Sequence, residues 1–181
     1  MEKAFKYRIY PNKYQKQMLA KTFGCVRFVY NYYLKKRIDM YKSDNLTLNY
    51  SQCSRDLTSL KRQEAYCWLN EIDAISLQSS LKNLDQAFQN FFKKPGTGFP
   101  KFKSRKTHNY SYTTKYTNGN IKLHAKHIKL PKLGVVKTKV SRPAEGRILS
   151  ATISQTQAGK YYVSVCCTDV ATCKDGQISR L

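Results

Sequence analysis

Residues 74–98 read AISLQSSLKNLDQAFQNFFKKPGTG, and the pattern changes within the segment. Its large apolar residues recur at alternating steps of four and three, which predicts a helix packed against other helices over 74–93. These residues are Leu77, Leu81, Leu84, Phe88 and Phe91. A proline and two glycines in KPGTG then end the helix, and the helical spacing does not return after Gly98.

Helical spacing also dominates the residues before this segment. From Lys13 to Tyr41, large apolar residues recur at three- and four-residue steps, which predicts one long amphipathic helix. The polar stretch KSDNLTLN interrupts it. Ser51 can then cap a second helix that runs to about Arg62. A block of helices is therefore expected ahead of Pro95.

Short strands are predicted on both sides of the helical block. KAFKYRIY (3–10) alternates apolar and charged residues, so that Phe5, Tyr7 and Ile9 share one face. After Gly98 six strands separated by turn residues are predicted. They are SYTTKYT (111–117), NIKL (120–123), HIKLP (127–131), GVVKTKV (134–140), ILSATISQT (148–156) and YYVSVCC (161–167). Because closure protects the edges of short strands, an α+β fold is expected, with a small antiparallel β-barrel and a helical bundle inserted after its first strand.

This pattern predicts four parts of the chain. Residues 1–10 form the first barrel strand, 11–97 the inserted helical domain, 98–169 the rest of the barrel and 170–181 a tail.

The charge is strongly one-sided. Lys and Arg number 33 against 11 Asp and Glu, a formal net charge of +22. Such a charge opposes compaction unless an anion neutralises it, so nucleic acid is the first candidate partner and a membrane surface the second. No apolar run is long enough to span a bilayer, and MEKAFKYRIYPN lacks the apolar core of a signal peptide. A cytoplasmic protein without a membrane partner is expected.

The excess of positive charge is concentrated after the helices. Between Asp85 and Glu145 there is no carboxylate in 59 residues, which carry 14 Lys and Arg. The segment FPKFKSRKTHNYSYTTKY (99–116) combines this charge with aromatic residues. Lys101, Lys103, Arg105 and Lys106 suit phosphates, and exposed rings suit unpaired bases. The alternative is a solvated loop with ordinary core aromatics.

No catalytic or metal-binding constellation is predicted. The six cysteines include no C-x-x-C pair, which favours reduced and mostly buried thiols. His124 and His127 are three residues apart, a step that puts them on opposite sides of a strand, and no carboxylate is near. Metal-dependent nucleases need converging carboxylates, which are scattered here. Composition thus indicates a binding protein.

Two helical features allow both a structural and a functional interpretation. Tyr50–Ser54 is a polar helix start, which can donate to phosphate or simply cap the helix. Gln78, Lys82 and Gln86 share one helix face, which can contact base edges and phosphates or merely face water. From the residues alone the structural interpretation is favoured for both.

Several segments, in order, resemble the N-terminal half of the TnpB (OrfB) family of insertion-sequence proteins. They are KAFKYRIYPN, TFGCVRFVYNYYLKKR, WLNEIDAISLQSSLKNLDQAFQNFF, GFPKFKSR, NGNIKL and HIKLPKLGVVKTK. The resemblance covers residues 3 to about 168. It implies a wedge-like β-barrel split around a helical recognition domain, and an RNA-guided DNA endonuclease that binds a transposon-encoded guide RNA and a short transposon-adjacent DNA motif.

The resemblance also implies particular contacts. Its DNA-motif readers align with Tyr50, Ser54, Gln78, Thr117 and Asn118, while a lysine expected just before the glutamine is Ala74 here. Lys82 and the basic residues 101–106 would hold nucleic-acid backbones.

The tail departs from the family. Where relatives continue into a RuvC-like nuclease with a G-x-D-x-G strand, this chain reads ATCKDGQISRL. A catalytically incompetent chain without Mg²⁺ or Zn²⁺ is therefore expected, both metals belonging to the missing C-terminal half. A separately encoded chain that supplies the nuclease domain is one hypothesis for a partner. Two alternative functions are a stand-alone non-cleaving DNA-binding regulator and an active transposase or nuclease.

Overall fold

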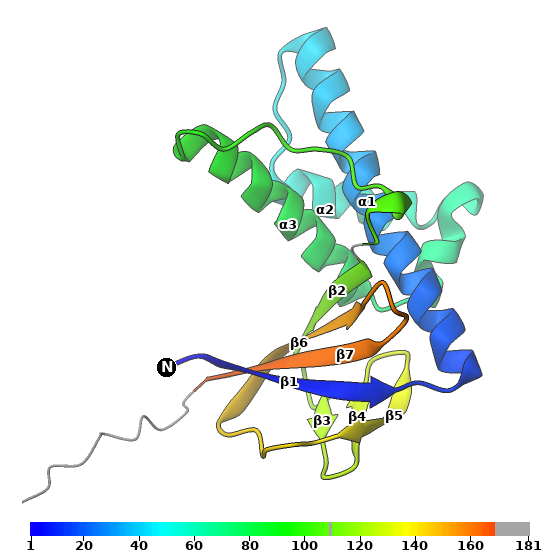
Figure 1. Ribbon diagram of the computed structural model, residues 1–181. Helices are drawn as coiled ribbons and strands as arrows, with labels where there is room; N and C mark the ends of the chain where they lie inside the picture. Colours follow the sequence, from blue (N-terminus) through cyan, green and yellow to red (C-terminus); the bar gives the residue numbers. More distant parts are fainter. Residues whose placement is uncertain (109, 169–181) are drawn as a thin grey trace, which may run out of the picture.

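The protein combines a helical bundle with one antiparallel sheet, which confirms the expected α+β class (Figure 1). A computed structural model describes residues 1–108 and 110–168. The predicted tail, 170–181, lies outside them. The elements are β1 (Lys3–Tyr10), α1 (Lys13–Asp44), α2 (Tyr50–Leu60), the 3-10 helix η1 (Glu64–Glu71), α3 (Ala74–Lys93), the 3-10 helix η2 (Arg105–Thr107), β2 (Tyr110–Lys115), β3 (Lys122–Leu123), β4 (His127–Leu130), β5 (Gly134–Lys139), β6 (Arg147–Gln155) and β7 (Tyr161–Thr168).

The helices begin at residues that cap them. Asn12 accepts a hydrogen bond from the Gln15 amide at the start of α1, and the Gln15 side chain accepts one from the Asn12 amide. Asn49 and Gln52 form the same reciprocal capping box at the start of α2. The prediction that Ser51 caps this helix is therefore wrong, because Asn49 stands three residues before a glutamine that completes the box.

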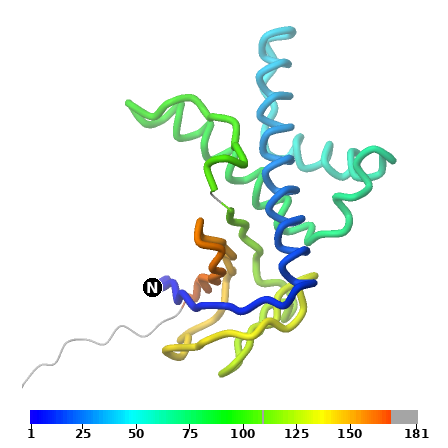
Figure 2. Tube along the Cα trace, turned by 45° about the vertical axis from the view of Figure 1, so that its right-hand side comes forward, coloured from blue at the N-terminus to red at the C-terminus, as the bar shows by residue number. Residues whose placement is uncertain are grey.

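The sheet runs in the order β2-β6-β7-β1-β5-β4-β3, with antiparallel pairing throughout. The first and last strands, β1 and β7, lie side by side, and α1 rises directly from the end of β1 (Figure 2). Strands β6 and β7 form a hairpin, in which the Thr156 amide donates to the Lys160 carbonyl at 2.9 Å. Strands β2 and β3 end the described sheet, and closure into a barrel stays a prediction.

One hydrophobic core runs through both parts. Phe5, Tyr7 and Ile9 of β1 are buried, as their alternation predicts. Val163 and Val165 of β7 lie opposite Tyr7 and Phe5 and are fully buried. In α3 the residues at the predicted helical steps are buried as far as Leu84.

A polar contact joins the bundle to the sheet. The Asp73 carboxylate accepts a hydrogen bond from the Ile75 amide at 3.2 Å and so caps α3. Its other oxygen accepts one from the buried Thr114 hydroxyl of β2 at 2.5 Å. The start of α3 is thereby fixed against β2, which brings the two parts into contact.

Candidate nucleic-acid interface

The basic segment 101–106 is attached to α1. The Lys103 amide donates to the Asn31 side chain at 2.8 Å, and the Asn31 amide group donates back to the Lys103 carbonyl at 2.9 Å. Ser104 then accepts from the Lys106 amide at 3.1 Å and starts η2. These bonds hold the backbone while the side chains of Lys101, Lys103, Arg105 and Lys106 remain exposed. The segment is thus an ordered, outward-facing array of cations.

Lys103 occupies a special place in this array. Its ammonium lies 4.3 Å from the centre of the Tyr30 ring, within cation–π range. Partial burial of the ammonium against α1 lowers the pKa of Lys103 although much of the residue is exposed. Lys103, Ser104 and Thr107 also line a small cleft together with Arg27 of α1. A phosphate there would meet two cationic side chains and two hydroxyls.

The structure brings together two of the residues singled out on the helices. The Lys82 ammonium lies 5.3 Å from the centre of the half-buried Tyr50 ring, so the start of α2 faces α3. Gln78 lies one turn before Lys82 on α3 and is exposed. Ser54 lies one turn after Tyr50 on α2 and is half-buried. Tyr50 and Lys82 form a local pair, with Gln78 and Ser54 one turn away along each helix.

Thr117 and Asn118 lie on the sheet side, in the turn between β2 and β3. The Thr117 amide donates to the Asn120 side chain at 2.7 Å, and Asn118 has a left-handed backbone with φ 48°. Both side chains are exposed. Within the described part of the chain, no hydrogen bond or ring contact joins this turn to Tyr50, Ser54 or Gln78. Their convergence on one DNA motif stays a prediction.

A further cationic surface was not identified from the sequence. The side of the sheet opposite the core, called here the outer face, carries positive side chains from β1, β5, β4 and β3. They are Lys6, Arg8, Lys137, Lys139, Lys129 and Lys122. Register places Arg8 opposite Lys139 and Lys122 opposite Lys129, so like charges lie side by side. Such neighbours repel each other unless an anion lies between them.

Tyrosine rings accompany these cations. Lys6 lies 4.9 Å from the centre of the Tyr162 ring and Arg8 lies 5.4 Å from the centres of both Tyr162 and Tyr10. The Arg8 Nε is buried and has no hydrogen-bond partner among the described residues. Buried donors are normally satisfied, and a phosphate oxygen is a suitable acceptor for a guanidinium. The alternating pattern of residues 3–10 predicts that Lys6 and Arg8 share the face opposite the core. It does not predict which strands lie beside β1.

On β7, β6 and β2 the outer face carries small hydroxyl residues. Ser164 of β7 lies opposite Thr152 of β6, and Thr152 lies opposite Thr113 of β2. The Thr113 and Thr152 hydroxyls lie 2.8 Å apart. Hydroxyls and cations are the side chains that commonly contact phosphate and sugar.

The two histidines are closer than expected. His124 and His127 flank the turn between β3 and β4, and their rings stack with centroids 4.7 Å apart. The expectation that they lie on opposite sides of a strand is wrong, because the chain turns between them. Among residues 1–108 and 110–168, no group of three or more His, Cys, Asp or Glu could hold a metal ion. The residues of these two ranges therefore do not fit a Mg²⁺ or Zn²⁺ site.

The cysteines of the described chain are free thiols. Cys25, Cys53 and Cys167 are buried, Cys166 is half-buried and Cys67 is exposed.

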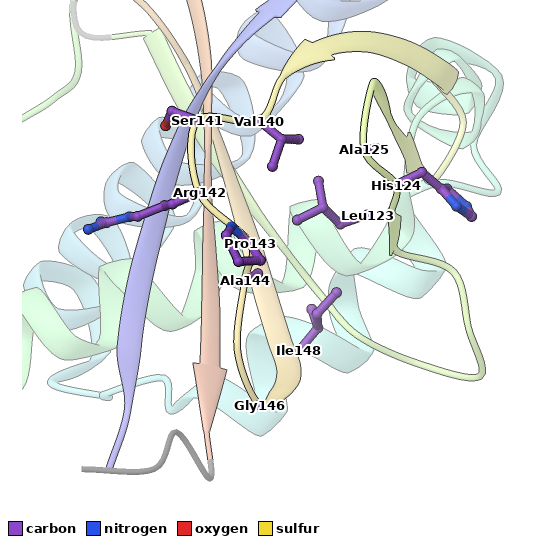
Figure 3. A pocket seen from close by; sticks show the side chains of 10 residues that line it. All are labelled: Leu123, His124, Ala125, Val140, Ser141, Arg142, Pro143, Ala144, Gly146 and Ile148. Atoms are coloured by element: carbon purple, nitrogen blue, oxygen red, sulfur yellow. The ribbon is translucent and has the colours of Figure 1, made fainter. Parts of the chain in front are cut away.

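A hollow lies between the β3–β4 turn and the β5–β6 connection. Leu123, Val140 and Ile148 surround it, while His124 and Arg142 extend away from it (Figure 3). Ser141 also lines it, beside several apolar residues. No helix in the described chain is long and apolar enough to cross a membrane.

An ordered basic segment and a carboxylate-free cationic sheet face define a nucleic-acid-binding module. Comparison with known proteins adds the family. Residues 1–45 match the family model described as the helix-turn-helix domain of OrfB_IS605. In that range the structure has β1 and the single helix α1, and α2 begins only at Tyr50.

Three curated proteins are similar to this chain in sequence. A "Putative RNA-guided DNA endonuclease" of Streptomyces pristinaespiralis is 36% identical over 175 residues, 95% of this chain and 43% of the relative. InsQ of Escherichia coli (strain K12), which has the same description, is 32% identical over 164 residues, 90% of this chain and 39% of InsQ. Virulence protein VsdF of Salmonella dublin is 34% identical over 113 residues, 58% of this chain and 95% of VsdF. The chain belongs to the TnpB (OrfB) family, and spans less than half the length of the first two relatives.

Proposed function

We propose that this chain is a nucleic-acid-binding module of an RNA-guided system, which binds a guide RNA encoded at a transposon end and a short DNA motif beside the transposon. The observation that carries the proposal is the outer face, where cations from four strands lie side by side without a carboxylate. The names of the Streptomyces and Escherichia relatives support the RNA-guided part.

The contacts are divided between the two parts of the molecule. The outer face and residues 101–106 hold phosphates, with Lys82 at the junction of α2 and α3. The exposed Gln78 amide reads a base edge in the DNA groove, as glutamine does with adenine. Tyr50 and Ser54 approach the motif from the start of α2, and Thr117 and Asn118 from the β2–β3 turn.

The chain binds without cutting in this proposal. Hydrolysis of DNA by a metal-dependent nuclease needs converging carboxylates, and four of the described acids are occupied elsewhere: Asp56, Asp85 and Glu71 pair with lysines or arginine, and Asp73 caps α3. Mg²⁺-dependent cleavage of motif DNA by the purified 181-residue chain would contradict this point.

The binding experiment uses filter binding of the purified chain to transposon-end RNA and to duplex DNA across a salt series. Affinity should fall steeply with salt, because cations on the protein displace counterions from phosphates. Replacing Lys101, Lys103, Arg105 or Lys106 by glutamine should each reduce the slope by about one. The control is Lys35→Gln, since Lys35 already pairs with Asp39 at 2.6 Å. A slope near zero in the unmodified chain would overturn the proposal.

Motif reading has its own test. Gln78→Ala should relax the choice among DNA motifs by about 1–3 kcal/mol while affinity for unrelated DNA changes little. Gln17→Ala removes another exposed glutamine, from α1, and should leave motif choice unchanged. Equal loss on every DNA sequence would show that Gln78 does not read bases.

A second function is a stand-alone DNA-binding regulator. The VsdF relative favours it, since the match covers 95% of that protein. RNA-free binding to motif DNA would support the regulator, and co-purification with a discrete transposon-end RNA would support the first function.

A further inference from the structure

Four phenylalanine rings gather at the C-terminal end of α3. Phe88, Phe91 and Phe92 belong to the helix, and Phe99 comes from the connection that follows it. Phe99 meets Phe88 and Phe91 edge to face, with centroids 5.5 and 5.3 Å apart. Phe92 lies 5.1 Å from Phe91. We call these four rings the phenyl platform.

One part of the phenyl platform packs on a buried residue, and another part is exposed to solvent. The Arg37 guanidinium lies 5.0 Å from the centre of the Phe88 ring, and Arg37 is itself buried and paired with Asp85 at 2.9 Å. By contrast 73% of Phe92 and 45% of Phe99 are exposed to solvent. A cluster of exposed large apolar side chains marks an interaction surface more often than a lone one does.

Packing of α3 does not explain Phe92. The stripe that packs α3 against the other helices consists of residues at steps of four and three, and its last member is Phe91. Phe92 lies one position beyond it and contributes little to the core. An exposed helix position is ordinarily filled by a polar or charged residue. Phe92 stacks on Phe88 with centroids 6.4 Å apart, but most of its ring remains available to a ligand.

The charges along the chain favour an anionic occupant. Lys93 and Lys94 follow Phe92 directly, Lys101 follows Phe99 by two residues, and all three are exposed. The nearest preceding carboxylate, Asp85, is already bonded to Arg37 and Gln89. A second copy of this chain, with its own charge of +22, would be repelled.

We propose that the phenyl platform binds unpaired bases of a nucleic-acid strand by stacking, beside phosphates held by the flanking lysines. The inference rests on the proposed nucleic-acid binding. It adds which part of the ligand is bound, the bases of an unpaired stretch, and where on the protein they bind. Rings of phenylalanine accept every base, because each base has a π-face, so the platform selects unpaired over paired structure.

The test uses a hairpin with a single-stranded extension that carries 2-aminopurine, made once as RNA and once as DNA. Stacking on a ring should change the 2-aminopurine emission when the full-length chain binds. Phe92→Ala should abolish that change and weaken binding of the extended hairpin about tenfold, with the blunt hairpin unaffected. The salt slope should stay the same, because no cation is lost. The RNA and DNA arms show which strand is preferred.

Two substitutions separate stacking from general apolar contact. Phe92→Trp should retain the emission change, and Phe92→Leu, apolar but not planar, should lose it. Tyr14→Ala is the matched control, since Tyr14 is 63% exposed on α1 outside the platform. Thermal unfolding of each variant checks the fold.

Four outcomes contradict the inference. They are an unchanged signal in Phe92→Ala, equal binding by Phe92→Leu, an equal loss on the blunt hairpin, and a concentration-dependent dimer in sedimentation that Phe92→Ala abolishes. If the unmodified chain binds neither hairpin, the proposed function itself fails. If it binds both equally and Phe92→Ala changes nothing, only the platform fails.

Discussion

The helical bundle and the sheet differ in how many of their cations lie beside a carboxylate. The four ion pairs within the described chain all join residues of α1 to α1, α2, η1 or α3. The seven strands contain nine Lys and Arg and no Asp or Glu. The bundle therefore neutralises part of its charge internally, whereas the cations of the outer face lie beside one another with no carboxylate in any of the seven strands.

This difference assigns separate roles to the two parts. Ion pairs in the bundle fix α1 against η1, α2 and α3, and α3 carries Lys82 and Gln78. Cations that lie side by side on the outer face repel one another and raise the free energy of the folded state, and an anion that binds only the folded chain lowers it again. Nucleic acid should therefore stabilise the protein mainly through the sheet.

The largest effect is expected from breaking the buried pair of the bundle. Asp85→Ala leaves the Arg37 guanidinium, only 8% exposed, without its carboxylate and should lower the free energy of unfolding by about 3 kcal/mol. Urea denaturation followed by circular dichroism measures it. Asp39→Ala breaks the exposed Lys35 pair and should cost less than about 0.5 kcal/mol. Similar losses in both variants would show that the Arg37 pair is not special.

Binding should depend most on the sheet. The triple variant Lys6→Gln, Arg8→Gln and Lys139→Gln should weaken nucleic-acid binding about 100-fold near physiological salt and reduce the salt slope by about three. Thermal stability without ligand should be unchanged or higher, because like charges are removed. Lys42→Gln and Lys36→Gln in α1 serve as bundle controls. A variant that binds as the parent does would show that the outer face is not used.

Much of the fold could be predicted because local signals agreed with the packing. The bounds of α3 follow from its apolar steps and from KPGTG, and the seven strands follow from alternation and turn residues. The cap of α2 was mispredicted because Asn49 and Ser51 are both good caps, and Gln52 decides between them. The histidine pair was mispredicted because the turn lies between the two residues.

The next effect tests the contact between the two parts. Thr114→Val keeps the shape of the buried side chain but leaves the Asp73 carboxylate without the Thr114 hydroxyl. The free energy of unfolding should fall by about 1–2 kcal/mol, because a bond to a charged group is lost. Thr113→Val removes a half-buried hydroxyl from the outer face and should cost less. An equal cost would mean that the Asp73 bond does not stabilise the junction.

The candidate interface was less predictable than the fold. Residues 101–106 were identified from composition, since charge without counter-charge is visible in the sequence. The proximity of Lys82 to Tyr50 depends on how α2 packs on α3, and the pairing of Arg8 with Lys139 depends on strand register. The residues of each pair are far apart in the chain, and a local sequence pattern does not predict that they lie close in space.

The smallest effect is a difference in thiol reactivity between the sheet and the bundle. Cys166 is half-buried on the outer face opposite Ala4, and Cys67 is exposed in η1. Bound nucleic acid should slow alkylation of Cys166 a few-fold and leave Cys67 unchanged, as read by mass spectrometry of the labelled peptides. Protection of Cys67 alone, or equal protection of both, would place the ligand on the wrong part of the molecule.

Cys25 provides the internal control for this measurement. Burial, with a smaller contribution from Glu71, raises the pKa of its thiol from 9.0 to about 11, so it should stay protonated and unreactive near pH 8 in the folded chain. Between pH 9 and about 11 the unfolded chain loses this proton while the folded chain keeps it. The free energy of unfolding should therefore fall as pH rises through that window, and Cys25 should become reactive as the chain unfolds. Labelling of Cys25 at pH 8 as fast as Cys67 would show that the bundle opens around it, and the protection of Cys166 could then not be assigned to the sheet.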